Sequence, residues 1–94
     1  MTVYLAWTSS ALDHADELEG PWSELRVAAP GVLLLESDER LSPVYHALKW
    51  SLPEGAALMV SPVVERPKLK GLAAGTTTWL RDRVPPGESA ERAV

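Results

Sequence analysis

The chain has 94 residues, a formal net charge of −4, 46% hydrophobic residues and no cysteine. This length corresponds to one domain with a thin core, and the hydrophobic content is that of a folded globule rather than a disordered chain. The lack of cysteine excludes disulfides, thiolate catalysis and cysteine-based zinc sites, and the excess of acids disfavours general nucleic-acid binding.

The chain opens with a strand pattern over residues 2–8. Leu5 and Trp7 point to one face and Tyr4 and Ala6 to the other, so both faces are largely apolar. A strand that is apolar on both faces is typical of the centre of a sheet.

A helical pattern follows, with apolar residues at helical spacing up to Leu18. Ser9 and Ser10 offer hydroxyls for its N-terminal cap, and the Gly20-Pro21 pair ends it. The predicted helix is short, with about three turns at most.

Two strand patterns then surround the turn dipeptide Pro30-Gly31, which predicts a hairpin. Residues 22–29 alternate between apolar and charged side chains, which is typical of an edge strand. Residues 32–37 are apolar on both faces, which again indicates a central strand.

A second helix is predicted from Ser42, which can cap it, to the Pro53-Glu54-Gly55 turn. Residues 56–64 form the fourth strand pattern. Pro62 lies inside this strand and cannot donate a backbone hydrogen bond, so it favours an edge position.

A final helix is predicted over residues 76–84, capped by a threonine and anchored by Trp79, Leu80 and Val84. The Pro85-Pro86-Gly87 run ends it. We expect residues 85–94 to be a disordered tail.

The elements together predict an α+β domain over residues 1–84, with a ferredoxin-like β-α-β-β-α-β antiparallel sheet. The first two helices should lie on one face of the sheet, and the C-terminal helix is an addition. In this order the first and third strands are central, which agrees with their local patterns.

Several short motifs support a family resemblance: the Tyr4-Leu5 first strand, Trp22 before the hairpin, the capped second helix, Leu58-Met59-Val60 in the fourth strand, and the closing helix over residues 78–84. With these features the chain resembles the SinR-like small ferredoxin-fold proteins, which are related to the CRISPR-associated adaptation subunit. The resemblance covers about residues 2–84.

Nuclease-like members of that wider group carry an aspartate just after the first strand, where two subunits place acids around a metal. This chain has Trp7-Thr8-Ser9-Ser10 there, and its first acid is Asp13. The departure argues against metal-dependent cleavage, and members without the aspartate would be binding or assembly proteins.

Acidic side chains and His14 cluster in the first predicted helix, and Ser9, His14 and Asp16 could be drawn as a triad. Their spacing places no nucleophile beside a base, and an acidic run of this kind is typical of a solvated helix face. His46 beside the second apolar stripe is interpreted as a boundary residue. We therefore predict no catalytic residue, no metal site and no cofactor.

Five bases in the second half of the chain form a candidate patch for an anion or a partner. They are Arg66, Lys68, Lys70, Arg81 and Arg83. The alternative is a solvated basic loop that balances the acidic half of a partner subunit.

Five aromatic residues are candidate anchors for an interface or a ligand. They are Tyr4, Trp7, Trp22, Trp50 and Trp79. Core packing is the alternative for each of them, and a platform for stacked bases or aromatic ligands is a third possibility.

The chain begins in a strand, without a signal-peptide pattern, and its longest apolar run, residues 31–35, is too short to span a bilayer. We therefore expect a cytoplasmic protein without a membrane partner.

An open apolar sheet face predicts a homodimer, packed sheet to sheet or with the C-terminal helix laid across the other subunit. The favoured function is a non-catalytic, dimeric interaction or regulatory protein with a possible protein partner. The alternatives are a small-molecule-binding dimeric α+β barrel protein or enzyme with a tryptophan-lined pocket, and a degenerate metal-dependent nuclease.

Overall fold

The computed structural model of the chain describes residues 1–10 and 18–86. The first predicted helix, with Asp13 and His14, and most of the predicted tail therefore lie outside the described residues. In chain order the described elements are β1 (Thr2–Thr8), β2 (Glu24–Ala29), β3 (Val32–Ser37), α1 (Leu41–Ser51), β4 (Leu58–Val63) and α2 (Thr76–Arg83).

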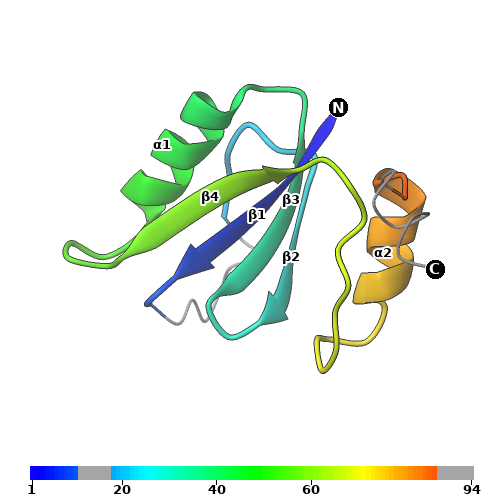
Figure 1. The fold of residues 1–94 in the computed structure, drawn as a ribbon. Helices are drawn as coiled ribbons and strands as arrows, with labels where there is room; N and C mark the ends of the chain where they lie inside the picture. Colours follow the sequence, from blue (N-terminus) through cyan, green and yellow to red (C-terminus); the bar gives the residue numbers. More distant parts are fainter. Residues whose placement is uncertain (11–17, 87–94) are drawn as a thin grey trace.

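The strands form one four-stranded sheet in the order β2-β3-β1-β4, in which every neighbouring pair is antiparallel (Figure 1). The predicted α+β class is confirmed, and so is the position of the first and third strands at the centre. β2 and β4 are the two edges, as the charged alternation of β2 and Pro62 in β4 predicted.

Several predicted element ends differ from those observed. β2 begins at Glu24 rather than Trp22, and β4 is shorter than residues 56–64. Neither helix carries the predicted side-chain cap: α1 begins at Leu41, and α2 follows Gly75, whose positive φ of 88° lets the chain turn into the helix. Thr76 is buried instead of capping.

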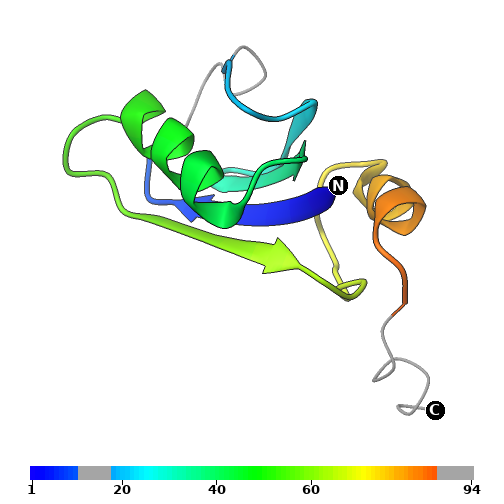
Figure 2. The same ribbon diagram turned by 90° about the horizontal axis from the view of Figure 1, so that it is seen from above.

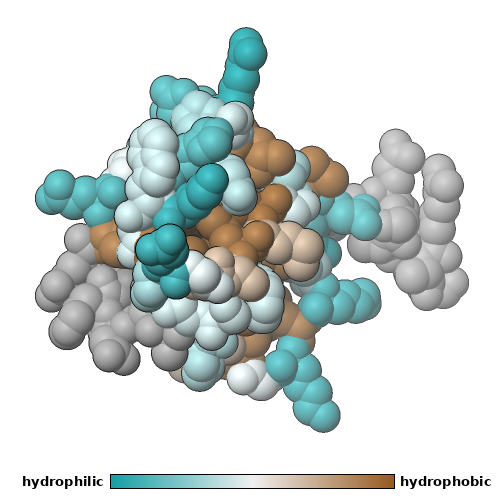
Figure 3. Space-filling view, turned by 90° about the vertical axis from the view of Figure 1, so that its left-hand side faces the viewer, coloured by the Kyte–Doolittle hydropathy of each residue, from teal (hydrophilic) through white to brown (hydrophobic). Residues whose placement is uncertain are grey.

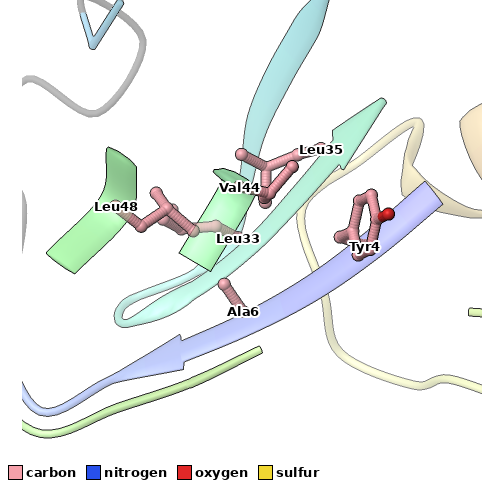
Figure 4. Close-up of a cluster of buried hydrophobic side chains, with 6 residues drawn as sticks. All are labelled: Tyr4, Ala6, Leu33, Leu35, Val44 and Leu48. Atoms are coloured by element: carbon pink, nitrogen blue, oxygen red, sulfur yellow. The ribbon is translucent and has the colours of Figure 1, made fainter. Parts of the chain in front are cut away.

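One hydrophobic core lies between the sheet and α1 (Figure 4). The stripe of α1 contributes Val44 and Leu48, which face the sheet. The sheet contributes alternate residues of its two central strands, because successive side chains of a strand point to opposite faces. These residues are Tyr4, Ala6, Leu33 and Leu35.

A second core lies on the other face of the sheet, under α2. Trp79, Leu80 and Val84 pack there against Val3 and Leu34. Figures 1 and 2 show α1 and α2 on opposite sides of the sheet. The chain's own C-terminal helix covers one end of this face, and the expected homodimer stays a prediction.

Among the described residues, the helices are too short and too polar for any of them to cross a bilayer.

The β2–β3 turn generates a stability prediction. Gly31 has a φ of 76°, and a Cβ atom there would lie 2.5 Å from the carbonyl oxygen of Thr8. The N–H of Thr8 in turn donates to the Gly31 carbonyl. We expect Gly31→Ala to lower the free energy of unfolding by about 2–4 kcal/mol, from backbone strain and the clash together.

Gly55→Ala is the matched control, because Gly55 has a similar φ of 88° but open space around it. It should cost about 1–2 kcal/mol, the strain alone. Urea unfolding of both variants measures the difference. Equal losses in the two variants would show that the contact between the turn and Thr8 contributes nothing to the free energy of unfolding.

Candidate interaction surface

Three large apolar side chains remain exposed on the sheet face that α2 only partly covers. Leu5 and Trp7 of β1 are 40% and 44% exposed, and Met59 of β4 is 65% exposed. Trp7 and Met59 are direct cross-strand partners, while Leu5 faces Ser61. We call Leu5, Trp7 and Met59 the apolar strip. An exposed apolar group of this kind is a candidate contact surface.

The apolar strip adjoins the open edge of β4. The N–H of Thr8 donates to the carbonyl of Gly31, the residue just before the β3 side of the hairpin, so the backbone N–H and C=O groups of Thr8 point toward β3. Because backbone direction alternates along a strand, Trp7 directs its own groups toward Met59. The N–H and C=O groups of Leu58 and Val60 therefore point outward, away from the sheet.

Pro62 fits this alternation. It pairs with Tyr4, which directs its backbone toward β3, so the proline nitrogen also lies on the outward side. A proline at such a position removes no ladder bond with β1. It removes one donor from the open edge, which limits pairing with another strand at that point.

The opposite edge of the sheet, β2, is built differently. It carries the charged residues Glu24 and Arg26, and the loop before α2 runs along it. The N–H of Ala73 donates to the Ala28 carbonyl at 2.7 Å, and Arg26 Nη2 donates to the Ala74 carbonyl at 3.0 Å. Charge and chain cover protect this edge, whereas β4 contains no charged residue.

A groove between α1 and β4 runs along the same open edge. Its volume is about 450 Å³, and Leu41, Tyr45, His46 and Val60 are among its lining residues. Figure 3, which views the side at the left of Figure 1, shows hydrophobic residues at the surface among hydrophilic ones. Apolar surface therefore lies on both faces beside the β4 edge.

The structure separates the predicted aromatic anchors into core and surface residues. Tyr4 is buried, and its hydroxyl donates to the Glu39 carbonyl at 2.7 Å. Trp79 belongs to α2 and is buried against the sheet. Trp22 is half-buried, and its Nε1 donates to the Leu18 carbonyl.

Trp7 and Trp50 are the two tryptophans at the surface. Trp50 is 79% exposed on α1, with its ring 5.7 Å from that of His46. Trp7 belongs to the apolar strip on the opposite face. The two rings therefore do not form one platform.

The predicted basic patch is only partly available for an anion. Arg66 donates to the carbonyls of Val84 and Arg81, so it holds the end of α2. Arg83 turns inward to the sheet. Lys68, Lys70 and Arg81 are exposed.

Arg83 joins α2 to two acids of the sheet. Its Nη2 forms an ion pair with Glu24, and its Nε lies 2.6 Å from a carboxylate oxygen of Glu36, although that N–H is not aligned for a hydrogen bond. The guanidinium also lies over the Trp79 ring, 4.3 Å from its centre. Ser23 donates to the same Glu36 carboxylate.

This cluster was not predicted from the sequence. Glu24 and Glu36 are cross-strand partners, so their like charges would repel without a cation between them. The sequence did contain a signal for it. Each strand of the hairpin carries an acid, and two acids on the same face need a basic side chain from another part of the chain.

One cavity has a volume of about 660 Å³. It lies between the β2–β3 hairpin and residues 71–73, and its lining includes Thr8, Val27 and Leu33. Its described lining holds no tryptophan and no charged side chain. It differs in this from the tryptophan-lined pocket that the sequence suggested for a small-molecule-binding protein.

No cluster of three or more histidine, aspartate or glutamate residues suited to a metal occurs in residues 1–10 and 18–86. The predicted triad cannot be placed, since His14 and Asp16 lie outside that range. Ser9 is placed, and its hydroxyl accepts a hydrogen bond from the N–H of Ala57 at 2.8 Å.

The chain matches no protein-family model, and no curated protein or solved structure is significantly similar to it. The functional argument therefore rests on the residues and their geometry.

The Arg83 cluster generates a prediction. In Arg83→Ala the carboxylate of Glu36, whose side chain is only 11% exposed, keeps Ser23 but loses its cation. We expect a loss of about 2–4 kcal/mol in the free energy of unfolding, because an uncompensated charge is left partly buried.

Arg81→Ala is the matched control, since Arg81 lies on the same helix and is exposed. It should stay within about 0.5 kcal/mol of the parent chain. Urea unfolding gives both values. A loss for Arg83→Ala no larger than that of the control would show that the cluster does not hold α2.

Proposed function

We propose that this chain is a non-catalytic interaction protein that acts as a homodimer. The observation that carries the proposal is the apolar strip, Leu5, Trp7 and Met59, beside the uncharged open edge of β4. A second copy is the partner that we propose, because a two-fold pair is the commonest closed assembly and the uncharged β4 edge places no like charges together at the axis.

Met59 is the residue of the strip that lies on the edge strand, and it is 65% exposed. Fully burying one large apolar side chain contributes about 1.5–3 kcal/mol relative to leaving it exposed, and a two-fold contact at this edge would bring in Met59 from both copies. Against this stand the lost freedom of association and the ordering of side chains.

The scaffold proposed for this function is ferredoxin-like, of the SinR-like kind. The strand order β2-β3-β1-β4 supports it, since the first and third strands are central and antiparallel. The SinR-like relation itself rests on the motifs of the sequence.

The position where nuclease-like relatives carry an aspartate also supports a binding role. In this chain Trp7 and Thr8 occupy it, and Trp7 belongs to the apolar strip. A cysteine-free composition suits a reducing cytoplasm, where we propose that the protein works.

The proposal predicts the oligomeric state. Sedimentation velocity at micromolar concentration should give about twice the 10.2 kDa of one chain. Met59→Glu should give a monomer, because a charge in the strip would meet its own copy. Trp50→Glu should remain a dimer, since Trp50 is more exposed but lies on α1. A parent chain that sediments as a monomer contradicts the proposal.

A further inference from the structure

We infer that two copies pair edge to edge along β4, with Met59 on the two-fold axis. Leu58 of one copy would then face Val60 of the other, and the two four-stranded sheets would join into one eight-stranded sheet. The inference rests on the proposed homodimer and specifies its interface.

The outward backbone groups of β4 select this register. With Met59 on the axis, the N–H and C=O groups of Leu58 and Val60 all find partners in the other copy. Pro62 then lies opposite Ala56, beyond the paired segment, where its missing N–H costs nothing.

Neighbouring registers leave groups without partners. An axis at Val60 or Ser61 places Pro62 inside the ladder, so a carbonyl of the other copy loses its donor. An axis at Leu58 places Val60 opposite Ala56, whose N–H already donates to the Pro53 carbonyl. Unpaired backbone groups that are buried by an interface are costly, so these registers are disfavoured.

On the face of the sheet that carries the apolar strip, the side chains fit the same register. Trp7 and Met59 are cross-strand partners within one copy. The axis extends this row to Met59 and Trp7 of the second copy, so the two apolar strips become continuous. Such rows of adjacent side chains are the units that stabilise sheets.

The other face of the edge also carries apolar surface. Val60 forms part of the groove between α1 and β4, together with Leu41 and Tyr45. A ladder as short as Leu58–Val60 is marginal by itself, and side-chain contacts across the edge, Met59 with Met59 on one face and Leu58 with Val60 on the other, add to its hydrogen bonds.

Single cysteines test the register on a background without cysteine. Opposite residues of a non-hydrogen-bonded pair have Cα atoms about 4.5 Å apart, which a disulfide can bridge. Met59→Cys should therefore form disulfide-linked dimers under mild oxidation, at least tenfold faster than the control. Ser61→Cys is that control, because the two copies of residue 61 would lie about 13 Å apart along the edge.

A backbone variant tests the edge itself. Val60→Pro removes an N–H that points away from β1, so the ladder within one copy is kept. We expect the dimer dissociation constant to rise at least tenfold, with an unchanged strand signal in circular dichroism. Val60→Thr, which keeps the N–H and the branched shape, should leave the constant within about twofold.

The outcomes separate the inference from the function on which it rests. A parent chain that dimerises while Met59→Cys links no faster than Ser61→Cys overturns the edge pairing and leaves the homodimer intact. A dissociation constant that is unchanged in Val60→Pro also overturns the edge pairing and leaves the homodimer intact. A monomeric parent chain overturns both.

Discussion

The two apolar faces of β1 are the constraint on which the rest of the structure depends. β1 lies between β3 and β4, so its edges are paired and its faces must be covered. α1 covers Tyr4 and Ala6 on one face, and α2 covers Val3 on the other. A helix of eight residues spans about 12 Å, whereas a strand of seven spans about 23 Å. α2 is therefore too short to shield Leu5 and Trp7 as well.

The contacts of α2 decide which end of that face stays open. Arg83 binds Glu24 and Glu36 at one end of the β2–β3 hairpin and lies over the Trp79 ring. Arg66 holds the last carbonyls of the helix from the preceding loop. These polar contacts fix α2 at the end of β1 that carries Val3, and the apolar strip is the consequence at the other end.

The same geometry explains why some predicted site residues lose that role. Arg66 and Arg83 are chemically suited to bind an anion, but their guanidinium groups are used within the chain. Tyr4 is suited to an interface, but its face of β1 lies under α1. Residue type indicated the capability in each case, and the position of a helix determined whether the side chain was available.

Local patterns in the sequence determined the four strands, their central or edge positions and the Pro30-Gly31 turn, because alternation and turn preferences depend on near neighbours. They could not determine the face on which α2 packs. That choice depends on contacts such as the one between Arg83 and Glu24, which are 59 residues apart in the chain. Only the tertiary structure therefore decided that Leu5, Trp7 and Met59 stay exposed while Val3 and Leu34, with similar patterns, are buried.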